Sequence, residues 1–437
     1  MTDCNLEPIE FPAVNRRRIF MEFTGNHVTS DGGALLLPMI DKKLDLCRRA
    51  SLAIPDDRDQ SKIIHTTESM LKQMVFGLAL GYEDLNDHDS LRNDPCISAA
   101  TGSLEPLASS PTLCRMQNRA DRSTALKLNM LLVDAYVESF DSPPKEIILD
   151  FDRTDDRVHG EQDNRGFHGY YKHYCFLPLY VFAGERLLCA YLRPSLEDGA
   201  KHSAAVLKLL TDRLRKEWPE VRIIFRADGG FCRKMTMSWC ERNGVDYIIG
   251  CTGNAVLKKM GEPTMEKARI QWLGARLKQR EFTDLSYGAK SWKKERRVIL
   301  KAEHHALGAN PRFVVTTLAG EAKALYEDVY CARGEMENRI KEQQLCLFAD
   351  RTSCTKWWPN QFRMLLSGLG YALLEGIRRF GLEGTHLARA RCDTIRLKLL
   401  KIGAVVLGNT RRIRIIASEH NPKNEMLTNV IAALRSG

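Results

Sequence analysis

The feature that most constrains the fold is a run of β-rich and helical segments between residues 146 and 251. Three β-rich segments come first, and two helical segments then alternate with two more strands: residues 146–152, 174–182, 186–193, 199–218, 221–227, 232–243 and 246–251. Consecutive strands pair antiparallel, whereas strand–helix–strand units cross over right-handed between parallel strands. The order β-β-β-α-β-α-β therefore predicts an α/β fold, with a mixed sheet and helices on both faces.

The residues before this run have helical patterns. Apolar residues recur at helical spacing over residues 71–78, with Thr66 or Thr67 as the N-cap. A short helix opening at Ser110 and a longer helix over residues 124–140 are expected next. Because the short helix carries arginine, glutamine and asparagine, this region is either a helix-turn-helix DNA reader or a plain helical cap.

The residues after the run are basic and then helical again. Residues 252–329 contain lysine and arginine clusters, with strand-like pieces at residues 297–301 and 312–318. The helical pattern returns near Cys331, and an amphipathic helix runs from Pro359 to Gly381.

These changes, together with the Pro143-Pro144 pair, predict four parts. They are a mainly helical DNA-binding and dimerisation region (1–144), the α/β domain (145–251 with 330–384), an inserted basic, partly β subdomain (252–329) and a basic C-terminal region (385–437).

Charge and cysteine content bear on the partners and the cellular compartment of the protein. The 437 residues contain 65 Lys and Arg against 55 Asp and Glu, and the net charge of +10 suits a polyanion, although many proteins carry it without one. The 13 cysteines include no Cys-x-x-Cys pair, so reduced thiols in a cytoplasmic protein are expected. No apolar run reaches the ~20 residues of a membrane span, and the N-terminus lacks the apolar segment of a secretion signal, so no membrane partner is expected.

Aspartates fall at strand ends of the predicted sheet. Asp150 and Asp152 are two residues apart at the end of the first strand, so their side chains share one face. Asp228 follows the strand over residues 221–227, in an Asp-Gly-Gly sequence that is also common in simple turns. Because the first and fourth strands are neighbours in this strand order, the aspartates should meet at one edge, where ligands of open α/β sheets collect.

A further polar group lies on the predicted helix after residue 329. Tyr330, Arg333, Glu337 and Lys341 share one helical face. Taken alone, the run could be surface ion pairs worth only ~0.3–0.5 kcal/mol each. Its combination with the aspartates is what favours a functional site.

Converging carboxylates predict a metal site. They are hard oxygen ligands that suit Mg²⁺ or Mn²⁺. Two such ions ~3.5–4 Å apart can activate an attacking oxygen and stabilise a leaving one in phosphodiester cleavage. The sequence shows no Ser-His-Asp or Cys-His arrangement and no P-loop, which disfavours a protein nucleophile and nucleotide-driven chemistry.

The predicted strand order is that of ribonuclease H-like nucleases and integrases, and motifs along nearly the whole chain make the likeness more specific. They are VTSDGG at 28–33, GYED at 81–84, LRNDP at 91–95, SPTLCR at 110–115, LDFDRT at 149–154, RADGGF at 226–231 and the Tyr-x-x-Arg-x-x-x-Glu run. On these motifs the chain resembles DDE transposases of bacterial insertion sequences, those of the insertion sequence 1380 family within the broader insertion sequence 4-like group. The resemblance implies a ribonuclease H-like catalytic domain with a β-containing insertion and an N-terminal helical domain.

Carried over residue by residue, the resemblance implies that Asp152, Asp228 and Glu337 are the catalytic, metal-binding residues, with two Mg²⁺ or Mn²⁺ ions per active site. Asp150 remains a rival for Asp152, because alternation places both on one face. The related transposases have a basic residue seven positions after the glutamate, where this chain has Gln344, so Lys341 is the expected substitute.

Phosphate or DNA contacts are expected from Tyr330, Arg333, Lys341, Trp292, Arg411 and Arg412. Trp292 lies among lysines and arginines in the predicted insertion, where it can stack on an unpaired base or belong to a small core. Arg411 and Arg412 lie in a C-terminal stretch with few acids, which can contact phosphates or be a solvated face.

The resemblance implies a DNA transposase that binds the terminal inverted repeats of its insertion sequence, cleaves DNA with the help of metal ions and transfers the cut strand to target DNA. The expected partners are double-stranded DNA and a second copy of the chain in a synaptic complex, in the bacterial cytoplasm at the nucleoid. Two alternatives stay open: a ribonuclease H-like nuclease without strand transfer, and a non-catalytic DNA-binding protein derived from a transposase.

Overall fold

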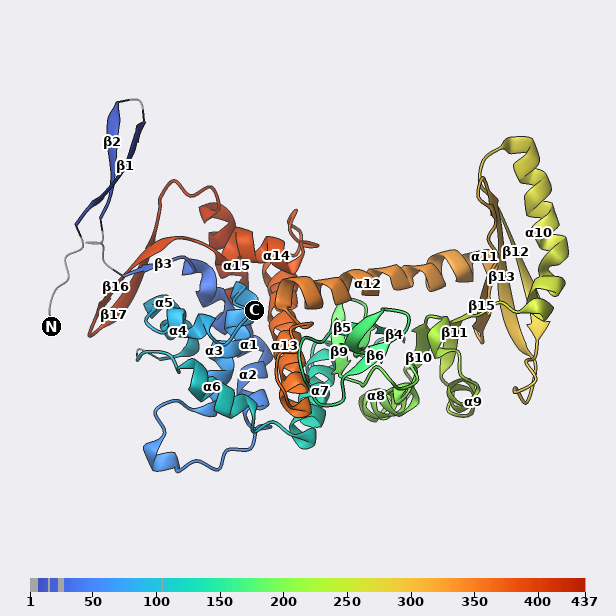
Figure 1. Cartoon of the computed structure of the whole chain (residues 1–437), viewed down its shortest axis with the longest axis horizontal. Helices are drawn as coiled ribbons and strands as arrows, with labels where there is room; N and C mark the ends of the chain where they lie inside the picture. The colour runs from blue at the N-terminus through green and yellow to red at the C-terminus, as the bar shows by residue number, and fades with distance from the viewer. Residues whose placement is uncertain (1–6, 15, 23–26, 104, 437) are drawn as a thin grey trace. The chain divides into compact units, whose positions relative to one another are not determined.

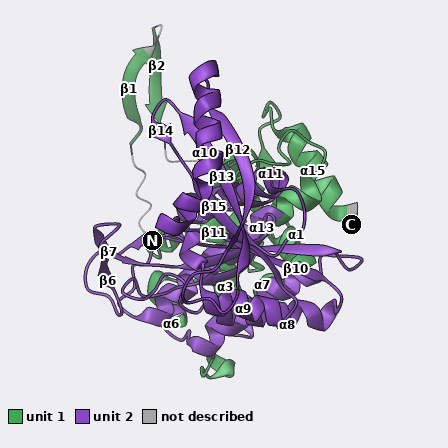
Figure 2. Cartoon of the chain, turned by 90° about the vertical axis from the view of Figure 1, so that its right-hand side faces the viewer, with its two compact units in different colours: residues 1–51, 56–116, 376–437 green, residues 52–55, 117–375 purple. Residues whose placement is uncertain are grey.

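The computed structural model describes residues 7–14, 16–22, 27–103 and 105–436. The chain divides into two compact units (Figure 2): residues 1–51, 56–116 and 376–437 form unit 1, and residues 52–55 and 117–375 form unit 2. Among the described residues, no helix is both long and apolar enough to cross a membrane. The functional division into four parts stays a prediction.

Unit 2 is built on a nine-stranded mixed sheet, which confirms the predicted α/β class (Figure 1). Eight strands follow one another in the order β12-β13-β15-β11-β10-β4-β8-β9, and β14 pairs with β13. The strands are β4 (Glu146–Arg153), β8 (Leu179–Ala183), β9 (Arg186–Tyr191), β10 (Arg222–Ala227), β11 (Asp246–Cys251), β12 (Gln279–Tyr287), β13 (Arg296–His305), β14 (Gly308–Ala309) and β15 (Arg312–Thr316).

The expected parallel and antiparallel pairs are present. β4, β10 and β11 are parallel neighbours, whereas β8 and β9 continue the sheet antiparallel. The crossover helices are α8 (Ser203–Glu217) and α9 (Lys234–Arg242). The predicted insertion supplies α10 (Ala255–Ala275) and β12 to β15, and β15 joins these strands to the central sheet by pairing with β11.

The single strand predicted over residues 174–182 is wrong. It is divided into β7 (His173–Phe176) and β8, because Pro178 lies between them and has no N–H to donate. β7 belongs to a separate three-stranded sheet with β5 (Asp156–Arg157) and β6 (Gly166–His168). We call residues 156–176, which form this small sheet, the flap.

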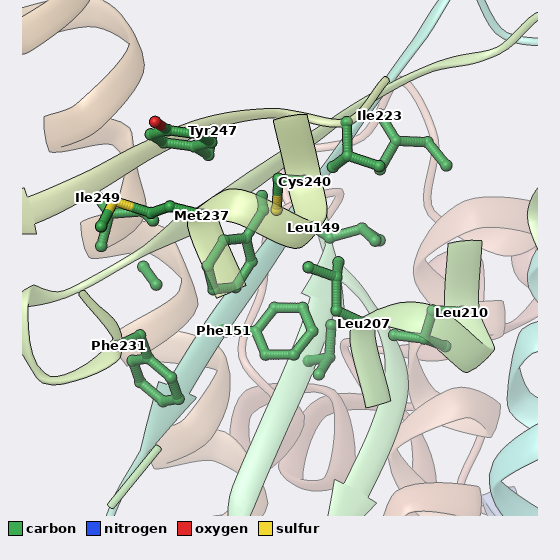
Figure 3. Packing of buried hydrophobic residues seen from close by; sticks show 14 of the residues in the cluster. Leu149, Phe151, Leu207, Leu210, Ile223, Phe231, Met237, Cys240, Tyr247 and Ile249 are labelled. Carbon is green, nitrogen blue, oxygen red and sulfur yellow. The ribbon is translucent and has the colours of Figure 1, made fainter. Parts of the chain in front are cut away.

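Alternation along β4 separates the core from the polar residues. Leu149 and Phe151 enter a large buried cluster on one face of the sheet (Figure 3). Phe151 packs edge-on against Phe225 there, with ring centroids 4.8 Å apart. Asp150 and Asp152 point to the opposite face, as a period of two requires. That face also carries an apolar cluster, which includes Ile224 of β10.

A long helical run covers this second face. It consists of α11 (Ala322–Ala324), η4 (Leu325–Tyr330), η5 (Cys331–Arg333), α12 (Gly334–Lys341) and η6 (Glu342–Cys346), shown in orange in Figure 1. It starts nine residues before the predicted Cys331, after an N-cap at Glu321 whose side chain accepts a hydrogen bond from the Ala324 N–H. η4 and η6 are π-helical, a geometry that changes the direction of side chains within a helix.

Two further helices complete unit 2. α7 (Arg122–Val137) begins at an Asp121 N-cap and packs on β9. α13 (Trp357–Gly381) begins two residues before the predicted Pro359. Its residues up to Glu375 belong to unit 2 and the rest to unit 1.

Unit 1 is mainly helical, with two small sheets. Its elements are β1 (Ile9–Val14), β2 (Arg17–Met21), β3 (Val28–Thr29), η1 (Gly32–Leu35), α1 (Leu36–Leu44), α2 (Leu46–Ser51), η2 (Gln60–Lys62), α3 (Thr67–Leu80), α4 (Asp87–Leu91), α5 (Pro95–Thr101), α6 (Ser110–Gln117, its last residue in unit 2), α14 (Cys392–Ile395), η7 (Arg396–Leu400), β16 (Ala404–Asn409), β17 (Arg412–Ala417) and α15 (Asn424–Ser436). The Thr66 cap is confirmed, because its side chain accepts a hydrogen bond from Ser69 N–H.

Two of the sequence motifs of unit 1 meet in one buried cluster. The Asp31 carboxylate accepts a hydrogen bond from the Tyr82 hydroxyl at 2.7 Å and forms an ion pair with Lys401 at 2.7 Å. Gly33 lies against the backbone of Leu399, since a Cβ there would be 1.8 Å from the Leu399 carbonyl oxygen. These motifs therefore stabilise unit 1 by joining the N-terminal residues, α3 and the C-terminal segment.

Candidate active site

The register of two parallel strands brings two of the predicted residues to the same level. Asp150 pairs with Arg226 and Phe151 with Ala227 across β4 and β10. Asp152 and Asp228 are the next residues on each strand, so they lie beside each other at the carboxyl end of the pair. This is the edge at which the sequence predicts the aspartates to meet.

Asp150 is engaged in a buried ion pair. The Arg226 guanidinium donates two hydrogen bonds to its carboxylate, at 2.5 and 2.6 Å, and a third to the Val329 carbonyl oxygen at 2.5 Å. Burial raises the pKa of Asp150, and the charge of Arg226 opposes that shift. Asp150 thereby joins β4, β10 and the helical run, and both of its oxygens are used.

Asp152 is the buried member of the candidate triad. Only 8% of its surface is exposed. One oxygen accepts a hydrogen bond from the Arg153 N–H at 2.9 Å and the other from Arg333 at 2.9 Å. Burial raises the pKa of Asp152 to about 6; Arg333 lowers it, while the charges of Asp228 and Glu337 raise it further.

Asp228 starts the short helical turn η3 (Gly229–Phe231). Its carboxylate accepts a hydrogen bond from the Gly230 N–H at 2.8 Å, which fixes the side chain at the strand end. The neighbouring glycine of β11 leaves room for the helical run: a Cβ on Gly250 would be 2.6 Å from the Tyr330 hydroxyl and 2.7 Å from the Gly229 nitrogen. Tyr330 can therefore approach Asp228 only because residue 250 has no side chain.

Arg333 connects the helix to the strand end. Besides Asp152, its guanidinium donates to the Glu337 carboxylate at 3.1 Å, one helical turn further on. Burial raises the pKa of Tyr330, and the charge of Asp228 acts in the same direction, so this tyrosine also faces the group. Lys341 is exposed and lies one turn beyond Glu337.

Gln344 and Arg153, which had no predicted role at the site, also lie beside it. The Gln344 amide donates to the Asp155 carbonyl oxygen at 3.1 Å and to the Asp156 carboxylate at 3.0 Å. The position seven after the glutamate thus lies against the residues that follow Asp152. Arg153 lies against Gly230, where a Cβ would be 2.9 Å from its guanidinium. The only sequence signal for a role of Arg153 at the site was its place in the LDFDRT motif.

The carboxylate donors fit a hard divalent cation, although they are not assembled into a complete metal site. Within the part of the chain that the structure describes, no three Asp, Glu, His or Cys side chains are close enough to hold one ion. Instead, Arg333 lies between the carboxylates of Asp152 and Glu337 and supplies the positive charge. Carboxylate oxygens prefer Mg²⁺ or Mn²⁺, and a buried, raised-pKa carboxylate gains from a cation beside it.

A hollow of about 270 Å³ opens beside Asp228. Aromatic rings, an arginine and exposed backbone line it: Gly229, Gly250, Cys251, Thr252, Gly253, Pro311, Arg312, Phe313, Tyr326 and Tyr330. A guanidinium beside aromatic rings can accept a planar group that carries an anion.

The other predicted DNA contacts lie outside this group. Trp292 is half-buried on the core; the Arg296 guanidinium lies 4.9 Å from its ring centroid, and Tyr287 packs edge-on against it at 5.4 Å. Arg411 and Arg412 are exposed at the turn between β16 and β17, where both backbone N–H groups bond to the Asn409 side chain.

Comparison with known proteins gives three findings. The family model described as transposase DDE domain group 1 matches residues 11–436. No curated protein matches. Among solved structures, a cryo-EM structure of the piggyBac transposase synaptic complex with hairpin DNA is similar at 11% identity and a TM-score of 0.44, over 86% of this chain and 83% of that one. From the match over nearly its whole length, the chain belongs to the family of transposase DDE domain group 1.

Proposed function

We propose that the protein is an active DNA transposase that cleaves the ends of its own insertion sequence and transfers the cut strand to target DNA. The observation that carries this proposal is that Arg333 bonds to both Asp152 and Glu337 at the strand ends where Asp152 and Asp228 lie side by side, in a chain of the DDE transposase family. The strand order β9-β8-β4-β10-β11 supports a ribonuclease H-like catalytic domain. The motif resemblance supports the insertion sequence 1380 family as the narrower assignment.

In this proposal Asp152, Asp228 and Glu337 hold two Mg²⁺ or Mn²⁺ ions, which when bound polarise the phosphodiester and activate the attacking oxygen. Arg333 then gives up its bond to Asp152 and turns its donors to the phosphate, since guanidinium groups bind phosphate oxygens in pairs. Arg153 and Tyr330 supply further donors at the same edge. Lys341, Arg411 and Arg412 add DNA contacts, and the exposed positions of these three support that role.

The test is cleavage and joining of DNA that carries the terminal inverted repeats of the element, with Mg²⁺. The wild-type protein should nick these ends and join them to target DNA as a homodimer, whereas Asp152→Asn should bind them without cutting. Asp246→Asn is the matched control. This aspartate starts β11, at the other end of the parallel strands from Asp152 and Asp228, and it forms a surface ion pair with Arg222.

Each alternative has its own signature. Cutting without joined products would identify a nuclease, and specific binding without cutting by the wild-type protein would identify a non-catalytic DNA-binding protein.

A further inference from the structure

The flap exposes aromatic rings that belong to no core. Tyr170 is 83% exposed, Phe167 52% and Tyr174 48%. Large rings normally bury most of their surface, so three exposed rings on a sheet of this size call for a function. The flap lies outside the residues assigned to catalysis, and the sequence pattern gave no role to most of it.

The rings form an ordered array. Phe167 and Tyr174 face each other across β6 and β7, with centroids 5.7 Å apart, and the Arg165 guanidinium lies 4.9 Å from the Tyr174 centroid. At the turn, Tyr170 and Tyr171 are edge-on with centroids 5.0 Å apart. Rings held in this way lose little freedom when a planar group stacks on them.

The charge of this surface suits a polyanion. Residues 164–176, the part of the flap that carries the exposed rings, include no Asp or Glu, while they include Arg165 and Lys172 together with His168 and His173. The flap itself contains three acids: Asp156, which is fully buried, Asp163, and Glu161, which forms an ion pair with Arg165. Asp155, just before the flap, bonds to His173 at 2.8 Å. Lys172, in the turn beside the tyrosines, is exposed.

The flap is fixed to the rest of unit 2 at its base. Asp163 N–H donates to the Thr355 carbonyl oxygen at 2.9 Å, and Ser195 donates to the Gly166 carbonyl oxygen at 2.7 Å. A tight turn with Lys172 in the left-handed region, at φ 59°, and a bond from its N–H to the His168 carbonyl oxygen closes the tip. The rings are therefore presented on a defined scaffold.

The flap also follows directly from the strand that carries Asp152. Asp155, three residues after Asp152, bonds to His173 on β7. Tyr171 packs against the same His173, with ring centroids 6.0 Å apart, so this ring also lies on the side of the strand end that carries Asp152. A DNA strand bound at Asp152 would thus pass close to these rings.

We propose that the flap is a binding site for unpaired nucleotides, on which the bases of a DNA strand separated from its complement stack against Tyr170 while Lys172 and Arg165 contact its phosphates. The proposal rests on the proposed function, since it concerns the DNA that the active site cuts. The alternating rings and cations favour nucleic acid over a protein partner, because bases stack on exposed rings whatever their sequence.

The experiment compares two labelled DNAs in fluorescence anisotropy without Mg²⁺: a fully paired element end, and the same end with its last nucleotides unpaired. Wild-type protein should bind the forked end more tightly. Tyr170→Ala should weaken binding to the forked end about tenfold, given the ~1–3 kcal/mol of one stacked base, and leave binding to the paired end unchanged. Tyr170→Phe keeps the ring and should behave as wild type. Leu307→Ala, at an equally exposed site 93% open to solvent, is the control for surface truncation.

The outcomes separate the two proposals. If Tyr170→Ala binds both DNAs as wild type does, or loses affinity for both equally, the flap does not hold unpaired bases, whereas cleavage by the wild-type protein would leave the transposase function standing. A wild-type protein that neither binds nor cuts element ends would overturn both.

Discussion

The structure gives Asp150 and Asp152 different surroundings, which the sequence could not distinguish. The resulting difference in their roles can be tested by mutation. In Asp150→Ala the Arg226 guanidinium stays buried with no carboxylate to accept its two hydrogen bonds. Removing one partner of a buried ion pair costs about 3–5 kcal/mol, because an uncompensated charge remains. Since small domains have only about 5–15 kcal/mol of unfolding free energy, the variant should be strongly destabilised.

Asp152→Asn should behave in the opposite way. Burial of the charged Asp152 carboxylate in the wild-type protein is unfavourable, and an asparagine at this position can still accept a hydrogen bond from Arg333. The free energy of unfolding without metal should therefore stay within about 1 kcal/mol of wild type or rise, while DNA cleavage is lost.

The assay is urea unfolding followed by circular dichroism, beside cleavage of element ends. The double variant Asp150→Ala/Arg226→Met is the decisive control, since it removes both charges and keeps apolar volume. It should recover about 2 kcal/mol or more of the stability lost in Asp150→Ala. If Asp150→Ala is as stable as wild type and inactive, while Asp152→Asn still cuts DNA, Asp150 is the catalytic aspartate and Asp152 the structural one.

Three more predictions follow from single residues. Because the folded state raises the pKa of Asp152 from 3.8 to about 6, metal-free protein should lose up to about 3 kcal/mol of unfolding free energy as pH rises from 4 to above 6, and Asp152→Asn should lack this part of the pH dependence. Gly250→Ala should displace Tyr330 and the η3 turn, so that unfolding shows a loss of about 1–3 kcal/mol and cleavage falls. Trp292→Ala should cost about 2 kcal/mol in thermal unfolding, since the ring packs on the core; unchanged stability with lost binding to forked DNA would instead support the predicted stacking role.

The elements that the sequence predicted well are those whose packing follows from a simple period. β4, β10 and β11 are short apolar runs bounded by turns, and α8 repeats its apolar residues every four positions. In each, one local pattern determines which face is buried. The meeting of Asp152 and Asp228 could be predicted for the same reason, because strand order alone places their ends together.

The elements that were misassigned or not predicted are those in which a second influence outweighs the period. Pro178 divides one apolar run into two strands of different sheets. α10 contains Pro263, which signals a helix end, but this proline is exposed within the helix and the buried face around Gly261 and Ala268 packs on β12 and β13. Tyr326 and its aromatic neighbours conceal the start of the long helical run, since such residues favour strands in isolation.

The roles of Asp150 and Gln344 depend on contacts between distant segments, which a period cannot give. Asp150 and Asp152 have the same alternation, and what distinguishes them is that strand register brings Arg226 opposite Asp150. Positions 337, 341 and 344 share one face of a regular helix, so periodicity alone cannot choose between Lys341 and Gln344. In the structure Gln344 reaches the residues that follow Asp152. The position at which related transposases have a basic residue is thus filled here by a neutral donor that binds the protein's own backbone and Asp156. In the proposed function, phosphate contact at this edge is therefore left to Arg333, Arg153 and Tyr330, with Lys341 further along the helix.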